Sequence, residues 1–124
     1  MNWEFDNNKP IYLQLVDILK LKIISGKLSA GSKLSSVRDM AEEAGVNPNT
    51  MQRALAELER EELVYSQRTS GRFVTEDEEK INLMRQTIAD IEIKSLFNIL
   101  INLGYKENEL IKIIIKSAGG LDNE

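Results

Sequence analysis

The chain of 124 residues contains no cysteine and no histidine. It therefore cannot form a disulfide, a thiol nucleophile or an imidazole general base, and it lacks the usual ligands of structural zinc. Any catalysis would depend on carboxylates, lysine, serine or tyrosine. The many glutamates fall on solvated helix faces, where no apolar pocket raises a carboxyl pKa. We therefore expect neither an enzyme nor a cofactor.

Long hydrophobic runs are scarce, and basic residues are outnumbered by acidic ones. No amino-terminal segment is apolar enough for a signal peptide, and no run reaches the roughly 20 residues of a membrane-spanning helix. The longest apolar stretch, IKSLFNILINL, is interrupted by lysine, serine and asparagine. We expect a cytoplasmic protein with no membrane partner. The formal net charge of −4 argues against nucleic-acid binding by overall charge, but not against a local basic face.

Residues 36–61 carry the signals of two short helices separated by a tight turn. Ser36, with an aspartate three residues later, fits a capping box. Gly45 can end the first helix in the left-handed conformation, and Asn47 followed by proline fits the start of the second. The pattern is that of a helix–turn–helix. The residues of its second helix expected to face the core are Met51, Leu55 and Leu58.

A third helix and a hairpin flank this motif. Apolar residues at helical spacing predict a helix over 10–25. The β-type runs at 63–67 and 72–75 surround the tip RTSG and predict a hairpin. The acidic segment EDEEK follows, and we place a domain boundary there.

Acidic residues are absent from the parts of this motif that would share one face. There is none between Gly45 and Ala56, nor in the hairpin, although four glutamates crowd the end of the second helix. The amino-terminal end of a recognition helix enters the major groove, where arginine contacts guanine and asparagine or glutamine contacts adenine. A basic hairpin beside it would act as a wing on the DNA. Taken singly, each residue also has a structural explanation: a cap for Asn47 or Thr50, an ion pair with Glu42 for Arg38.

The segment LSSVRDMAEEAGVNPNTMQRALAELEREELVYSQRTSGRFV resembles the winged helix–turn–helix of GntR-family transcription regulators. The preceding PIYLQLVDILKLKIISGKLSAGSKL resembles that family's first helix and lead-in, and GVNPNTMQRAL is similar to the YtrA-type subfamily. The resemblance covers residues 10–75. It implies a mainly α fold with a small β-hairpin wing, and a sequence-specific, DNA-binding transcriptional regulator that is expected to be a repressor.

The resemblance also implies which residues contact DNA, because the motif matches position by position. Arg38 corresponds to the arginine near the start of the family's second helix, and Gly71 to the second glycine of the wing. The DNA-contacting residues implied in this way are Arg38, Asn47, Asn49, Thr50, Gln52, Arg53, Arg68, Ser70, Gly71 and Arg72.

Three positions depart from the family pattern. Ser35 replaces the usual proline at the entry to the second helix, and Thr69 replaces the first glycine of the wing. Glu62 stands where the recognition helix usually ends with glycine. If the backbone there still has positive φ, the substitution costs roughly 1 kcal/mol.

The sequence divides into a winged helix–turn–helix domain over 1–75 and a helical dimerisation tail over 76–124. We expect tail helices over 81–103 and 107–116, with a frayed end from residue 119. Two helices cannot by themselves enclose a ligand pocket of about 300 Å³. The sequence therefore does not identify an effector or its binding site. The residues expected to form the dimer interface are Ile81, Met84, Ile88, Ile91, Leu96, Leu100 and Leu103.

The leading hypothesis is a homodimer that binds a double-stranded inverted-repeat operator. Two alternatives remain open. The tail could fold back on its own winged domain, and the winged helix could be a protein-interaction module that does not bind DNA. Salt-dependent binding to a duplex would separate the second alternative from DNA recognition, because phosphate contacts release counterions.

Overall fold

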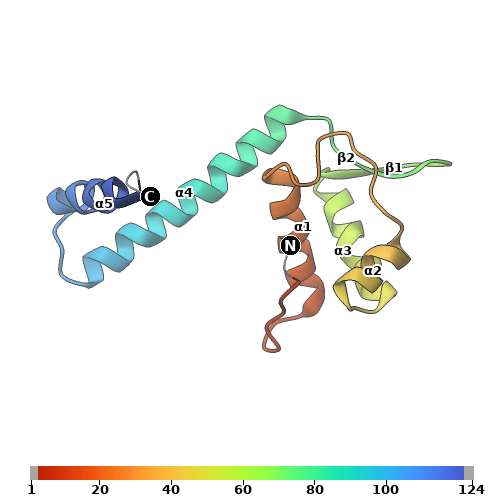
Figure 1. Ribbon diagram of the computed structural model, residues 1–124, viewed down its shortest axis with the longest axis horizontal. Coiled ribbons are helices and arrows are strands. Elements are labelled where there is room, and N and C mark those ends of the chain that lie inside the picture. Colours follow the sequence, from red (N-terminus) through yellow and green to blue (C-terminus); the bar gives the residue numbers. More distant parts are fainter. Residues whose placement is uncertain (1–2, 122–124) are drawn as a thin grey trace. The chain divides into compact units, whose positions relative to one another are not determined.

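The computed structural model describes residues 3–121, in which it contains five helices and one antiparallel hairpin (Figure 1). The helices are α1 (Ile11–Ile24), α2 (Val37–Ala44), α3 (Pro48–Arg60), α4 (Glu78–Asn102) and α5 (Glu107–Leu121), and the strands are β1 (Val64–Gln67) and β2 (Gly71–Val74). This is the mainly helical fold with a small hairpin that the sequence predicts. The chain forms two compact units, one ending at Met84 and the other beginning at Arg85, so the division lies inside α4.

The turn between α2 and α3 forms from the local signals in the sequence. The backbone N–H of Asp39 donates to Ser36 Oγ at 3.1 Å and caps the start of α2. Gly45 ends that helix with a φ of 72°, which a residue with a Cβ adopts only at a cost. The Asn47 side chain accepts from the Asn49 N–H at 2.8 Å and caps α3. The helix–turn–helix is therefore confirmed.

A single apolar core joins α1, α2, α3 and the hairpin. Met51, Leu55 and Leu58 on α3 are each at most 1% exposed, as their spacing predicts. Other members of this core are Leu15, Leu19, Ile23, Met40, Leu63, Val64 and Val74. Truncating one such leucine to alanine typically costs about 2–5 kcal/mol. The buried side of α3 is thus fixed, and its opposite side is left for solvent or a ligand.

The hairpin is held against the segment that precedes α2. Val64 pairs with Val74 and Gln67 with Gly71 in an antiparallel register. Lys33 forms an isolated bridge to β2, where the Leu34 N–H donates to the carbonyl of Arg72 at 2.9 Å. The hairpin therefore has support along one edge, which fixes its position beside the helix–turn–helix.

Glu62 lies after the end of α3 with a φ of 62°, in the left-handed region. The Leu63 N–H donates to the carbonyl of Leu58 across this residue at 3.0 Å, which closes the end of the helix. The positive φ anticipated from the usual glycine at this position is therefore present. The Glu62 carboxylate accepts from Lys80 Nζ at 3.2 Å.

The first turns of α4 belong to the winged unit. Ile81 is 6% exposed within the core of that unit, and Met84 packs against the same core. Both residues were expected in the dimer interface. Because their own unit covers these side chains, they are not part of the free surface of the tail.

The second unit contains the remainder of α4 and α5. Leu110 on α5 is buried, and Phe97 on α4 is half-buried. The helix α5 continues to Leu121, five residues beyond the predicted end at Lys116. It passes through Gly119 and Gly120, where a glycine costs about 1 kcal/mol relative to alanine. The frayed end predicted from residue 119 is wrong up to Leu121, and residues 122–124 lie outside the described residues.

Within residues 3–121, no helix combines the length and the apolar character that crossing a lipid bilayer requires.

Candidate nucleic-acid interface

One side of α3 presents amides, a hydroxyl and a guanidinium. Asn49, Gln52 and Arg53 are exposed and Thr50 is half-buried, while the opposite side of the helix is buried in the core. The spacing of Asn49, Gln52 and Arg53 is i, i+3, i+4, so the three side chains share one helical face. No acidic residue interrupts this face before Glu57. Its chemistry suits hydrogen bonding to base edges.

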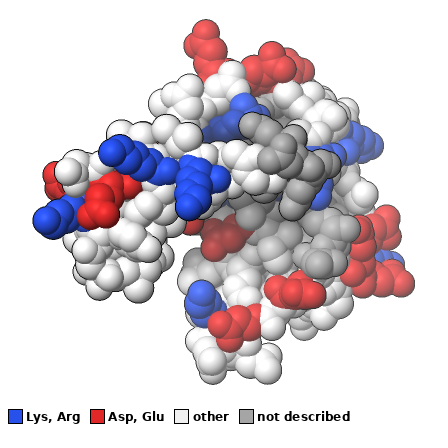
Figure 2. Space-filling model, turned by 60° about the vertical axis from the view of Figure 1, so that its left-hand side comes forward, with Lys and Arg blue, Asp and Glu red and all other residues white. Residues whose placement is uncertain are grey.

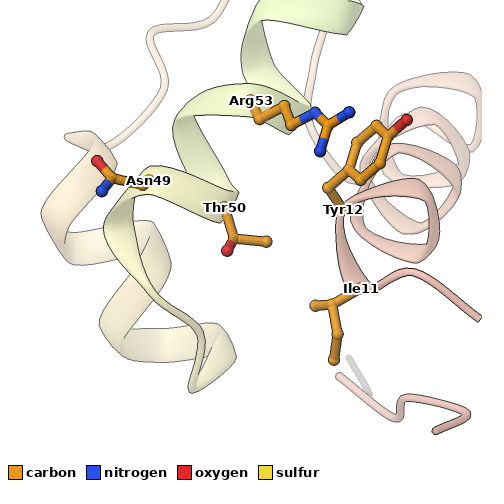
Figure 3. Close-up of a pocket in the computed structure, with 5 residues that line it drawn as sticks. All are labelled: Ile11, Tyr12, Asn49, Thr50 and Arg53. Atoms are coloured by element: carbon orange, nitrogen blue, oxygen red, sulfur yellow. The ribbon is translucent and has the colours of Figure 1, made fainter.

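A hollow of about 360 Å³ lies beside this face, between the first turns of α1 and α3. Its lining residues are Ile11, Tyr12, Asn49, Thr50 and Arg53. Figure 3 shows the Arg53 side chain extending to the ring of Tyr12, with Thr50 and Ile11 directed toward the same space. The Arg53 Cζ lies 3.7 Å from the centre of that ring, well inside the range of a cation–π contact. The start of α1 is thus part of the candidate interface.

Arg72, predicted to be a wing residue that contacts DNA, is already paired within the protein. Its Nε donates to Glu59 Oε1 at 2.9 Å, and its side chain is 21% exposed. Ser66 Oγ donates to the same carboxylate oxygen. The hairpin residues themselves include no acid, but Glu59 near the end of α3 contacts the hairpin in the folded chain.

The pKa of Glu59 follows from these contacts. Burial raises it, but the hydrogen bonds from Ser66 and Arg72 and the charge of Arg72 outweigh burial, so the pKa lies below the ordinary glutamate value. The Glu59 carboxylate is therefore ionised at neutral pH and joins α3 to both strands of the hairpin.

Gln52 is oriented by the same guanidinium. Arg72 donates to Gln52 Oε1 at 3.4 Å, a long hydrogen bond. Because a guanidinium has donors only, the amide oxygen of Gln52 faces the wing and its NH₂ group faces away. Gln52 therefore offers donors to a ligand on the exposed side of α3.

A second hollow, of about 410 Å³, separates the start of α2 from the tip of the hairpin. Its lining includes Lys33, Ser35, Ser36, Ser70 and Gly71. Gly71 has a φ of 109°, and a Cβ at that position would lie 3.2 Å from Lys33 Cε. Lys33 and Gly71 therefore approach each other closely, which places the Lys33 ammonium group near the wing tip.

The ten residues predicted to contact DNA all lie in the winged unit. Those on its surface are Arg38, Asn47, Asn49, Gln52, Arg53, Arg68, Ser70 and Gly71, and those half-buried are Thr50 and Arg72. Asn47 is engaged as the cap of α3. The departures Ser35 and Thr69 are both exposed.

Sequence reasoning missed Tyr12, Ile11 and Lys33. Tyr12 lies one turn before the buried pair Leu15 and Val16, so it extends the buried side of α1 beyond the core. The position of Tyr12 on this side of α1 is the sequence signal that could have identified it. Figure 2 shows acidic and basic side chains interspersed on the one face that it draws.

The fold and this surface are those of a winged helix–turn–helix DNA-binding protein. The family model for "Bacterial regulatory proteins, gntR family" matches residues 11–74. The chain therefore belongs to the GntR family, and it is a transcriptional regulator with a DNA-binding domain.

Similar proteins span nearly the whole chain. The chain is 33% identical over 112 residues to YhcF of Bacillus subtilis (strain 168), an uncharacterised HTH-type transcriptional regulator, covering 90% of this chain and 93% of that protein. It is 33% identical over 107 residues to the HTH-type transcriptional repressor YtrA of the same organism, covering 86% and 81%. The YtrA-like resemblance is confirmed.

Solved structures share the fold. A GntR family transcriptional regulator from Listeria monocytogenes is 38% identical, with a TM-score of 0.81 over 90% of this chain and 98% of that one. AraR(DBD), solved in complex with operator ORR3, is 27% identical, with a TM-score of 0.52 over 60% of this chain and 88% of that one.

Proposed function

We propose that the protein is a sequence-specific transcriptional repressor that binds an inverted-repeat DNA operator as a homodimer. The observation that carries the proposal is the exposed, acid-free face of α3, with Asn49, Gln52 and Arg53 on it. The leading half of α3 enters the major groove, where these side chains meet base edges. The function requires no cofactor and is exercised in the cytoplasm, where the chromosome is accessible.

Groups around this face bind the DNA backbone. Arg38 on the first turn of α2 and Arg68 at the wing tip are exposed cations. The hollow between α2 and the wing adds Lys33 and the hydroxyl groups of Ser35 and Ser36. Such contacts fix the register of a protein on the duplex, and base contacts then supply the sequence preference.

Dimerisation is the role we propose for the second unit. The exposed apolar side chains of its helices are Ile91, Ile93, Leu96, Ile99, Ile101, Ile111 and Ile115, and the exposed Leu103 follows directly after α4. On α4 they lie at irregular spacing and point to several sides of the helix, and apolar side chains exposed in this number mark a surface that is covered by a partner. Because α5 can cover only one side of α4, a second copy of the chain covers another.

A groove supports the proposed docking of a second copy. About 460 Å³ of open space lies between α4 and α5, lined by Leu96, Leu100, Ile113, Ile114, Ser117 and Ala118. This lining has no charged group, which suits an apolar helix from the partner chain. Of the residues predicted for the interface, Ile88, Ile91, Leu96, Leu100 and Leu103 remain in the proposal.

The name of the relative YtrA supports repression as the regulatory outcome. A dimer that occupies two half-sites about 34 Å apart covers a promoter and blocks transcription there. The operator that such a dimer recognises has two-fold symmetry.

The proposal is tested by titrating the protein into a labelled duplex from the promoter of its own operon. A scrambled duplex of equal composition is the control, and both are measured at about 50 and 200 mM salt. We expect at least about 10³-fold tighter binding to the promoter, weakening steeply with salt, and a footprint of two symmetric half-sites. Equal binding to both duplexes would refute sequence specificity, and binding to neither duplex would instead support a winged-helix module that binds protein.

A further inference from the structure

Arg53 is the one candidate base-contacting residue whose charged group lies against an aromatic ring. Its Cζ is 3.7 Å from the centre of the Tyr12 ring, and the two residues come from the second turn of α3 and the first turn of α1 (Figure 3). The ring attracts the cation through its face and accepts none of the five guanidinium N–H groups. The contact therefore fixes where the guanidinium lies and leaves its donors free.

The electrostatic surroundings of Arg53 differ from those of two other arginines of the winged unit. Arg60 pairs with Glu57, and Arg72 pairs with Glu59. Within the described residues 3–121, Arg53 makes no ion pair with a carboxylate. A cation that is positioned by a neutral ring keeps its full charge for an anionic or electron-rich ligand.

We propose that Tyr12 is a positioning residue for DNA recognition, which holds Arg53 in the place from which it contacts a base. The inference rests on the proposed function. A free arginine side chain loses rotamer freedom when it binds, and a side chain that is already held loses less. Tyr12 thus makes α1, as well as α3, a determinant of operator affinity and specificity.

Structural packing alone is the competing explanation, and the position of the pair argues against it. Leu15 and Leu19 of α1 and Met51 and Leu55 of α3 are almost completely buried and already join the two helices. The Tyr12–Arg53 contact lies at their open end, where Arg53 is exposed and the 360 Å³ hollow begins. An exposed contact at this place adds little to the core but determines what the surface presents.

The test uses an operator duplex that the wild-type protein selects from a randomised library, with a scrambled duplex for comparison. The variants of the full chain are Tyr12→Leu, Tyr12→Phe, Arg53→Ala and the double variant Tyr12→Leu/Arg53→Ala. Leu13→Ala is the matched control, because Leu13 is the next residue of α1 and is 45% exposed. Dissociation constants on both duplexes and thermal unfolding are measured for each.

We expect Tyr12→Leu to weaken operator binding about 2- to 30-fold, the range of a cation–π contact, with little effect on the scrambled duplex. Tyr12→Phe keeps the ring and should stay within about twofold of wild type, as should Leu13→Ala. In the Arg53→Ala background, Tyr12→Leu should have no further effect, since the ring acts only through the guanidinium.

Three results would overturn the inference. Additive losses in the double variant would show that Tyr12 and Arg53 act separately. A loss in Tyr12→Phe as large as in Tyr12→Leu would assign the role to the hydroxyl. Equal losses on operator and scrambled duplexes, together with a lower unfolding temperature, would assign it to structure. If the wild-type protein selects no duplex, the proposed function itself fails. If the wild-type protein selects an operator but the effects of the Tyr12 and Arg53 substitutions are additive, only the role of Tyr12 fails.

Discussion

Arg72 on β2 and Glu59 near the end of α3 form an ion pair with a separation of 2.9 Å between Nε and Oε1. They are 13 residues apart in the sequence, and Ser66 on β1 donates to the same carboxylate. The Glu59 carboxylate on the recognition helix therefore binds side chains from both strands of the wing. The Glu59 carboxylate neutralises much of the charge of Arg72. We therefore expect Arg72 and Arg68 to have different roles, although both lie in the hairpin.

Arg68→Ala and Arg72→Ala should therefore affect DNA binding differently. Arg68 is exposed at the wing tip, so its loss should weaken binding to all sequences and lower the slope of log K against log salt by about one unit. Arg72→Ala should change the slope less and should instead lower the free energy of unfolding by about 0.2–1 kcal/mol. Salt titrations and urea unfolding of both variants test this. Equal reductions in slope would show that Arg72 leaves Glu59 to contact phosphate.

Glu59 should make part of the stability of the winged unit depend on pH. Its pKa is lowered in the folded protein, so its contribution is present above the unfolded pKa of about 4.3 and is lost as the pH falls through the folded value. We expect Glu59→Gln to be less stable than wild type at pH 7, with the difference shrinking as the pH falls below the unfolded pKa and disappearing once it passes the folded value. Urea unfolding across this range measures the effect. Glu42→Gln makes the same substitution at an exposed position of α2 and is the control for the substitution itself.

Glu62→Gly should stabilise the protein. Glu62 has a φ of 62°, and glycine adopts this conformation without the cost of roughly 1 kcal/mol that a side chain incurs. The ion pair with Lys80 is lost in the variant, but it contributes little because the Glu62 side chain is 83% exposed. Glu62→Ala is the control, since it removes the ion pair and keeps the Cβ. A midpoint of urea unfolding for Glu62→Gly no higher than that for Glu62→Ala would contradict the prediction.

The local parts of the fold could be predicted from the sequence because their signals are local. Ser36, Gly45 and Asn47 define the ends of α2 and α3 through bonds and dihedral angles within a few residues. Periodicity alone also identified the buried side of α3. Each of these features depends on the backbone conformation of one segment and not on the rest of the chain.

Contacts between distant segments could not be predicted in this way. Tyr12 and Arg53 meet because the cores of α1 and α3 place their first turns together, and neither residue is unusual in its own segment. Ile81 has the spacing of the tail helix, but spacing does not say which surface a side chain meets, and Ile81 is buried in the winged core. The candidate DNA-binding residues were therefore found by type and position, while the contacts that orient Arg53, Gln52 and Arg72 required the structure.

The burial of Ile81 also determines where the chain can be shortened. A chain that ends at residue 84 keeps Ile81 and Met84 on the core of the winged unit, whereas one that ends at residue 76 loses both. Burying a side chain of this size contributes about 1.5–3 kcal/mol. We expect the longer truncated chain to be the more stable by at least that amount in urea unfolding. Equal stability would show that Ile81 does not support the winged unit.

The longer truncated chain and two substitutions in the full-length protein test the dimer itself. Leu96→Asp and Leu100→Asp place a carboxylate in the apolar groove between α4 and α5, while Asn98→Asp adds the same charge at an exposed polar position of α4. Sedimentation at micromolar concentration should show dimers for wild type and Asn98→Asp, and monomers for the other three chains. A monomer binds one half-site and loses the effective concentration of the second, so operator affinity should fall about 10²- to 10⁴-fold. A monomeric wild-type protein, or full operator affinity in the truncated chain, would refute dimerisation through the tail.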